Sequence, residues 1–161
     1  AAGAGGGGRF VGARKPVGVR MKTLGRHLIV EYYRCSCDRL DDLSVIESGL
    51  VRAAEVIGAT VVGRAFHRYA PQGVTGVLLI AESHLSIHTW PESGYAAVDV
   101  FTCGGLDPRP AFGVLGELLR AREHRVQEIV RGVPDEVASG MPLSSADVVV
   151  STQLSPSSEE R

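Results

Sequence analysis

VTGVLLIAESHLSIHTWPESGYAAVDVFTCG, residues 74–104, is the stretch that decides the fold of this chain. Runs rich in β-branched and aromatic residues predict strands in and just before it, at 60–66, 74–80, 85–89 and 95–102. Turn residues separate these runs, with Pro-Gln-Gly at 71–73 and Pro-Glu-Ser-Gly at 91–94. The first three runs therefore predict neighbouring antiparallel strands, and the fourth adds another strand to the sheet.

The sequence on either side adds two strands and two helices. Residues 26–33 and 125–130 are β-prone, whereas residues 41–57 and 110–122 carry apolar side chains at spacings of three and four. Asp41 or Asp42 is the expected cap of the first helix, and Gly58 its expected stop.

These elements predict an α+β fold, a two-layer α/β sandwich with two helices on one face of a mostly antiparallel sheet. Two helices can hardly cover both faces of such a sheet. We therefore expect the other face to pack on a second copy, which gives a four-layer αββα dimer.

Composition excludes several classes of function. The chain has 161 residues, with 17 basic and 18 acidic side chains, so no charge excess points to nucleic acid or to a membrane surface. Its three cysteines form no Cys-x-x-Cys pair, which argues against a disulfide framework and a four-thiolate zinc site. We expect a cytoplasmic protein with a small-molecule or protein partner and no metal.

The ends of the chain differ from its middle. Residues 1–20 are mostly Gly, Ala and basic residues, and residues 144–161 are rich in Ser, so both predict disordered extensions. One domain is expected between them, over residues 21–143.

Chemistry concentrates in residues 81–104, which hold Ser83, His88 and Cys103. A metal site that uses His84, His88 and Cys103 is disfavoured, because strand residues four apart lie about 13 Å from each other. A Ser83–His88–Asp99 hydrolase remains an alternative, although no G-x-S-x-G motif surrounds the serine.

Self-cleavage is the third possibility. The Ser83 hydroxyl can attack the preceding carbonyl in an N-to-O acyl shift, if the local backbone is strained. Removal of the Ser83 α-proton then expels the Glu82 carboxylate, and the dehydroalanine left behind hydrolyses to a pyruvoyl group. Ser83 and His88 lie five residues apart, so in a straight strand they point to opposite faces about 16 Å from each other. Their cooperation requires a bend, a bulge or a partner subunit.

The segments LGRHLIVEYY, PQGVTGVLLIA and ESHLSIHTWPESGYAAVDVFTCG resemble the bacterial and archaeal form of S-adenosylmethionine decarboxylase, a pyruvoyl enzyme of polyamine synthesis. The resemblance runs from about residue 21 to about residue 131. It implies cleavage between Glu82 and Ser83 into chains 1–82 and 83–161, with Ser83 as the precursor of the pyruvoyl group.

The same resemblance implies roles for further residues. His88 would be the proton acceptor in processing, Cys103 the proton donor in decarboxylation, and Thr75 a hydroxyl that assists processing. Tyr69 and Trp90 are candidates for stacking on the adenine.

The implied reaction joins the pyruvoyl ketone to the α-amine of S-adenosylmethionine as a Schiff base, which withdraws electrons as CO2 leaves. The product is an aminopropyl donor for spermidine synthesis. Two alternatives stay open, namely an ornithine or arginine decarboxylase on the same scaffold and an unprocessed regulatory pseudoenzyme subunit. The expected assembly is a homodimer, or a dimer of processed chain pairs.

Overall fold

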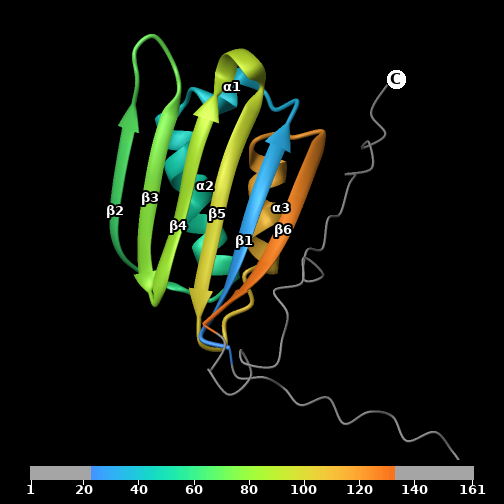
Figure 1. The fold of residues 1–161 in the computed structure, drawn as a ribbon. Coiled ribbons are helices and arrows are strands. Elements are labelled where there is room, and N and C mark those ends of the chain that lie inside the picture. The colour runs from blue at the N-terminus through green and yellow to red at the C-terminus, as the bar shows by residue number, and fades with distance from the viewer. Residues whose placement is uncertain (1–22, 133–161) are drawn as a thin grey trace, which may run out of the picture.

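Six antiparallel strands form one sheet in the computed structural model, which describes residues 23–132 (Figure 1). The strands are β1 Gly25–Tyr33, β2 Thr60–Arg68, β3 Val74–Ala81, β4 Ser83–Trp90, β5 Tyr95–Cys103 and β6 Glu123–Arg131. Their order across the sheet is β2-β3-β4-β5-β1-β6. The predicted sheet and its antiparallel neighbours are confirmed, and β1 lies between β5 and β6. The expectations for residues 1–20 and 144–161 lie outside the described residues.

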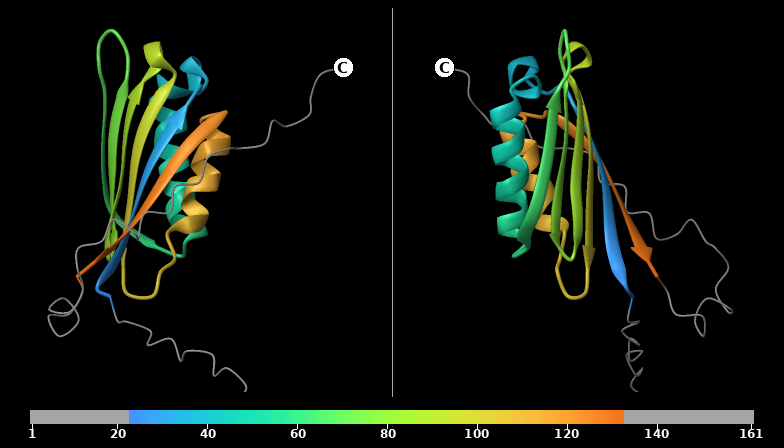
Figure 2. Two further views of the ribbon diagram at one scale, coloured as in Figure 1. Left: turned by 45° about the vertical axis from the view of Figure 1, so that its right-hand side comes forward. Right: turned by 90° about the vertical axis from the view of Figure 1, so that its left-hand side faces the viewer.

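Two helices of ten residues or more cover one face of the sheet, as predicted (Figure 2). They are α2 Leu43–Val56 and α3 Arg109–Leu118. The Asp42 side chain caps α2 by accepting hydrogen bonds from the Ser44 and Val45 backbone N–H groups, at 2.9 and 3.2 Å.

Two short helical segments were not predicted, α1 Cys37–Leu40 and the 3-10 helix η1 Pro91–Ser93. A segment of three or four residues is too short to show a helical period. The helix predicted over 110–122 ends earlier than expected, because Arg120 adopts a left-handed φ of 51°. The Ala121 N–H then returns to the Gly116 carbonyl at 2.9 Å.

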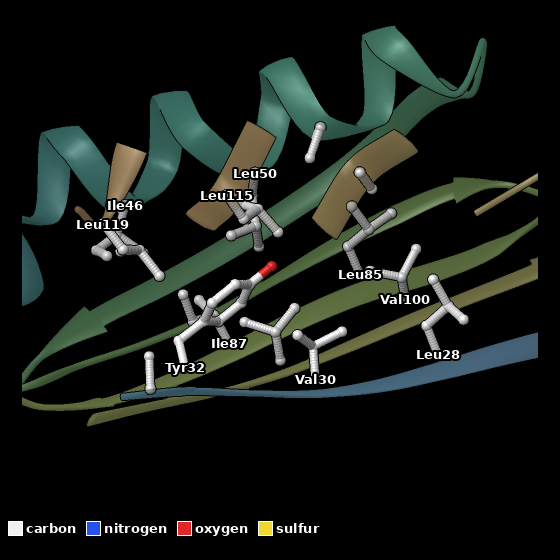
Figure 3. Packing of buried hydrophobic residues seen from close by; sticks show 14 of the residues in the cluster. Leu28, Val30, Tyr32, Ile46, Leu50, Leu85, Ile87, Val100, Leu115 and Leu119 are labelled. Atoms are coloured by element: carbon white, nitrogen blue, oxygen red, sulfur yellow. The ribbon is translucent and has the colours of Figure 1, made fainter. Parts of the chain in front are cut away.

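The core lies between the sheet and these helices (Figure 3). Alternate residues of the central strands, such as Val30 and Ile87, point toward α2 and α3 and are fully buried. The buried Tyr32 phenol donates a hydrogen bond of 2.5 Å to the Phe112 carbonyl of α3. The core therefore fixes which face each strand residue occupies.

The sheet face opposite α2 and α3, called here the open face, carries the other alternate residues. His88 lies on it, because its neighbours Ile87 and Thr89 are buried on the helix side. Large apolar side chains are also exposed there, with Leu79 at 52% and Trp90 at 41%. Within residues 23–132 no helix is long and apolar enough to cross a membrane.

Candidate functional site

Ser83 lies at the tip of the β3–β4 hairpin. It pairs with Ile80, so only Ala81 and Glu82 form the turn. Turns of this length favour Gly, Asn or Asp, which accept a positive φ, and neither residue is of that kind. Ser83 itself has a φ of 118°, a value that L-residues rarely adopt. Such backbone strain costs on the order of 1–3 kcal/mol and lies next to the Glu82–Ser83 bond.

Cys103 lies at the same end of the sheet as Ser83. Ser83 pairs with Thr102 of β5, and Cys103 is the next residue and the last of that strand. Strand spacing places the Cα atoms of Ser83 and Cys103 about 6 Å apart. The Cys103 side chain is half-buried and its thiol is free. The structure therefore brings the backbones of these two predicted residues side by side, while the alternation of β4 and β5 assigns their side chains to opposite faces of the sheet.

His88 and Thr75 lie together at the opposite end. They are register partners on β4 and β3, and the Thr75 Oγ1 and His88 Nδ1 share a hydrogen bond of 2.9 Å. Strand β4 runs from Ser83 to Trp90 with an unbroken register on both sides, so neither a bend nor a bulge shortens the distance between Ser83 and His88. Five residues of strand amount to about 16 Å.

The aromatic candidates also lie at the His88 end. Trp90 is tilted against His88, with ring centroids 6.2 Å apart, and against Tyr95 at 5.1 Å. Tyr69 is half exposed beyond the end of β2, where its ring meets His67 edge-on at 4.6 Å. Burial, and then the hydrogen bond that the phenol donates to Glu31, raise the pKa of Tyr95 and keep it neutral.

The hydrolase arrangement is not assembled within one chain. Asp99 accepts hydrogen bonds from Ser86 at 3.0 Å and pairs with the His27 Nε2 at 3.1 Å, and neither Ser83 nor His88 contacts it. Asp99 lies opposite Ser86 in the middle of β5, away from both the Ser83 end and the His88 end of β4, so one chain does not bring the three residues of that triad together.

Sequence reasoning missed an ion-pair cluster beside Cys103. Arg26 of β1 binds Glu128 of β6 and also contacts Asp107, which follows β5. These partners are 102 and 81 residues apart in the chain, so no local pattern joins them. A local signal is Asp107 itself, a residue of the capping type three positions before the predicted helix 110–122.

Comparisons with known proteins agree with this geometry. The family model for S-adenosylmethionine decarboxylase matches residues 26–132. The S-adenosylmethionine decarboxylase proenzyme of Thermosipho melanesiensis is 51% identical over 126 residues, which cover 78% of this chain and 95% of that protein. The proenzyme of Geobacillus kaustophilus is 48% identical over 124 residues, 76% of this chain and 100% of that one.

A solved structure is similar as well. The crystal structure of the adenosylmethionine decarboxylase from Aquifex aeolicus matches with a TM-score of 0.66 and 36% identity, and covers 71% of this chain and 96% of that chain. The resemblance seen in the sequence is confirmed, and the chain belongs to the S-adenosylmethionine decarboxylase family.

Proposed function

We propose that this protein is a self-processing decarboxylase of S-adenosylmethionine that cleaves its own chain between Glu82 and Ser83. The observation that carries the proposal is the φ of 118° at Ser83, next to the bond to be cut, in a chain of this family. Strain in the starting amide that is relieved in the ester lowers the cost of the acyl shift.

Processing uses groups of the chain itself. The Ser83 Oγ attacks the Glu82 carbonyl carbon, the C–N bond breaks and an ester forms. A base removes the Ser83 α-proton and the Glu82 carboxylate leaves, which gives dehydroalanine. Its imine tautomer adds water and releases the residue's own nitrogen as ammonia, and the pyruvoyl group remains. His88 is the proposed base, and the Thr75 hydroxyl orients its imidazole through the 2.9 Å hydrogen bond.

The distance between Ser83 and His88 favours a site shared by two copies. One end of the sheet holds Ser83 and Cys103, and the other end holds Thr75 and His88. Two sheets that pack open face to open face about a two-fold axis perpendicular to their strands place each end against the opposite end of the partner. A second copy of this chain is therefore the occupant that we propose for the open face, and each dimer then contains two complete sites.

The residues present fit a pyruvoyl group, since a serine stands at the strained hairpin and a free thiol lies one position along the neighbouring strand. When formed, that group supplies the electron withdrawal that lets CO2 leave the substrate. Cys103 then donates the proton to the substrate carbon that carried the carboxylate. Tyr69 and Trp90 offer aromatic faces for the adenine. The free thiols of all three cysteines support a cytoplasmic location.

Mass spectrometry of the purified chain tests processing. We expect two pieces that end at Glu82 and begin at residue 83, the second without a free amine. Ser83→Ala should stay intact, whereas Ser86→Ala, which removes a hydroxyl from the same strand, should be cleaved. An intact parent chain, or cleavage of Ser83→Ala, would contradict the proposal.

Mixing two inactive variants tests the shared site. Ser83→Ala and His88→Ala should each remain uncleaved alone. In a mixed dimer one site combines an intact Ser83 with an intact His88, so up to half of the sites recover. Only the His88→Ala chain should be cut. Failure of the mixture under conditions where the parent dimerises and cleaves would place the whole site in one chain.

Release of CO2 from S-adenosylmethionine, compared with ornithine and arginine, decides the substrate. If the chain is cleaved but releases CO2 only from ornithine or arginine, the proposal of self-processing stands and the proposed substrate, S-adenosylmethionine, is wrong.

A further inference from the structure

The backbone that follows Cys103 has little packing of its own. Gly104 and Gly105 are exposed, and a Cβ built at either one meets no atom within 4 Å. Gly104 also adopts a positive φ of 67°. The Gly104 N–H donates a long hydrogen bond of 3.4 Å to the Leu24 carbonyl, and Cys103 is the last register partner of β1, opposite Gly25. The end of β5 is therefore tied to the rest of the sheet through few contacts of these two glycines.

The remainder of loop 104–108 is tied to the sheet from both sides. The Thr102 hydroxyl donates a hydrogen bond of 3.2 Å to the Leu106 carbonyl, and Arg26 Nη1 contacts the Asp107 carboxylate at 3.2 Å. Thr102 and Arg26 are register partners of β5 and β1. Both contacts of loop 104–108 therefore reach the Thr102–Arg26 pair. This pair is adjacent in the β5–β1 ladder to the pair that Cys103 forms with Gly25.

Arg26 is itself held in place. Its Nε donates a hydrogen bond of 2.6 Å to Glu128 of β6, and its Nη2 contacts the same carboxylate oxygen. The side chains of Arg26 and Glu128 are 27% and 21% exposed, so water screens this pair only in part. The guanidinium thus joins loop 104–108 to two strands of the sheet.

Asp107 is charged at neutral pH. Hydrogen bonds from the Arg109 side chain, and then from its backbone N–H, lower the pKa of Asp107 to about 2, and Arg26 adds to the effect. Arg109 lies in the first turn of α3 and contacts Asp107 locally, at 2.6 to 3.0 Å, without reaching the sheet. Among residues 23–132, Arg26 is the side chain that ties the Asp107 carboxylate to β1.

We propose that the Arg26–Asp107 ion pair is a positioning device for Cys103, which holds the thiol where it protonates the correct carbon during decarboxylation. The inference rests on the proposed function. Arg26 and Asp107 do not touch the reacting atoms, and they act by fixing the loop on which the direction of Cys103 depends.

Placement matters because the proton has two possible destinations after CO2 leaves. On the substrate carbon it yields the decarboxylated product. On the carbon derived from Ser83 it leaves an N-terminal alanine, since nitrogen passes from the substrate to the protein and water releases the substrate as an aldehyde. The second outcome ends catalysis. A misplacement of about 1 Å can cost on the order of 100-fold in a positioned step.

The first test needs no processed enzyme. In the uncleaved Ser83→Ala chain, the alkylation rate of Cys103 by iodoacetamide is measured by peptide mass spectrometry, with the exposed Cys37 as internal standard. Asp107→Asn should raise the rate of Cys103 relative to Cys37 by about threefold to fivefold, the range that the loss of a partly exposed ion pair allows. Arg109→Gln, the matched control, should leave the ratio unchanged.

The second test uses the processed enzyme with S-adenosylmethionine and counts N-terminal alanine formed per CO2 released. Asp107→Asn should raise this ratio severalfold, and Arg109→Gln should not. If Asp107→Asn folds poorly by its thermal midpoint, the double variant Arg26→Gln with Glu128→Gln removes the same tie and leaves no carboxylate of the Arg26–Glu128 pair unpaired.

Cys103→Ala distinguishes the proton-donor role of Cys103 from the positioning role of the Arg26–Asp107 ion pair. If Cys103→Ala raises the alanine ratio and neither tie variant does, the positioning role is overturned while the proposed function stands. If Cys103→Ala keeps the parent ratio, the proton-donor role itself fails. An equal response of Arg109→Gln and Asp107→Asn would also overturn the inference, because Arg109 does not reach β1.

Discussion

Gly25→Ala and Gly113→Ala form a pair of substitutions with opposite expected effects. A Cβ built at Gly25 would lie 2.6 Å from the Phe101 Cε2 and 2.9 Å from the Thr102 carbonyl oxygen. A Cβ at Gly113, inside α3, would meet nothing within 4 Å. The first substitution forces β1 away from β5 beside Cys103, whereas the second fills open space on a helix.

The magnitudes follow from these contacts. The Phe101 ring edge can turn aside, but the Thr102 oxygen belongs to a paired strand and cannot move alone. Overpacking of this kind costs about 1–3 kcal/mol. In α3, alanine should add about 0.5–1 kcal/mol to the free energy of unfolding, because glycine loses more backbone entropy in a helix.

Urea denaturation on the uncleaved Ser83→Ala chain measures both effects on a single covalent species. The midpoint should fall for Gly25→Ala and rise for Gly113→Ala, at an unchanged slope. A Gly25→Ala chain as stable as its parent would refute the argument, since it would mean that β1 and β5 can separate at Cys103 without cost.

Three further predictions concern buried or charged groups. Thr89→Val should lower the free energy of unfolding by about 1–3 kcal/mol. The Thr89 Oγ1 accepts a hydrogen bond from the Val74 N–H at 2.7 Å and donates one to the Leu40 carbonyl at 2.8 Å, and valine can do neither. Thr89→Ser should recover most of the lost stability in the same urea experiment. His124→Phe should raise the thermal midpoint, because the His124 Nδ1 is buried without a hydrogen-bond partner among the described residues; an unchanged or lower midpoint would speak against this. The pKa of Asp107 is lower in the folded chain than its ordinary value of 3.8, so the ionised Asp107 stabilises the fold above pH 3.8. This stabilisation is lost as the pH falls toward about 2. The difference in the free energy of unfolding between the parent and Asp107→Asn should therefore shrink over this interval.

Much of the fold follows from local patterns. The β-branched runs predict every strand to within a few residues at each end, and the Asp42 cap and the apolar spacing predict α2. The turns at 71–73 and 91–94 are short enough to make successive strands neighbours. The position of β1 between β5 and β6 could not be predicted, because it depends on pairing between residues from 64 (Tyr32 and Ala96) to 106 (Gly25 and Arg131) positions apart, which no local pattern encodes.

The candidate site divides in the same way. Ser83, His88 and Cys103 could be selected from sequence because they lie within 21 residues in one motif. The hydrogen bond between Thr75 and His88 depends on the register of the β3–β4 hairpin, and the tie between Arg26 and Asp107 depends on the position of β1. Geometry at that level requires the assembled sheet.

The strand order has a consequence for the chain after a cut between Glu82 and Ser83. The first piece then supplies β2, β3 and β1, and the second supplies β4, β5 and β6. Because β1 lies between β5 and β6, the two pieces are interleaved and share three ladders of hydrogen bonds, β3–β4, β5–β1 and β1–β6. Neither piece can leave without breaking all three of these ladders. Breaking the backbone therefore does not create a subunit that dilution removes, and the mature protein should unfold and be lost as one unit.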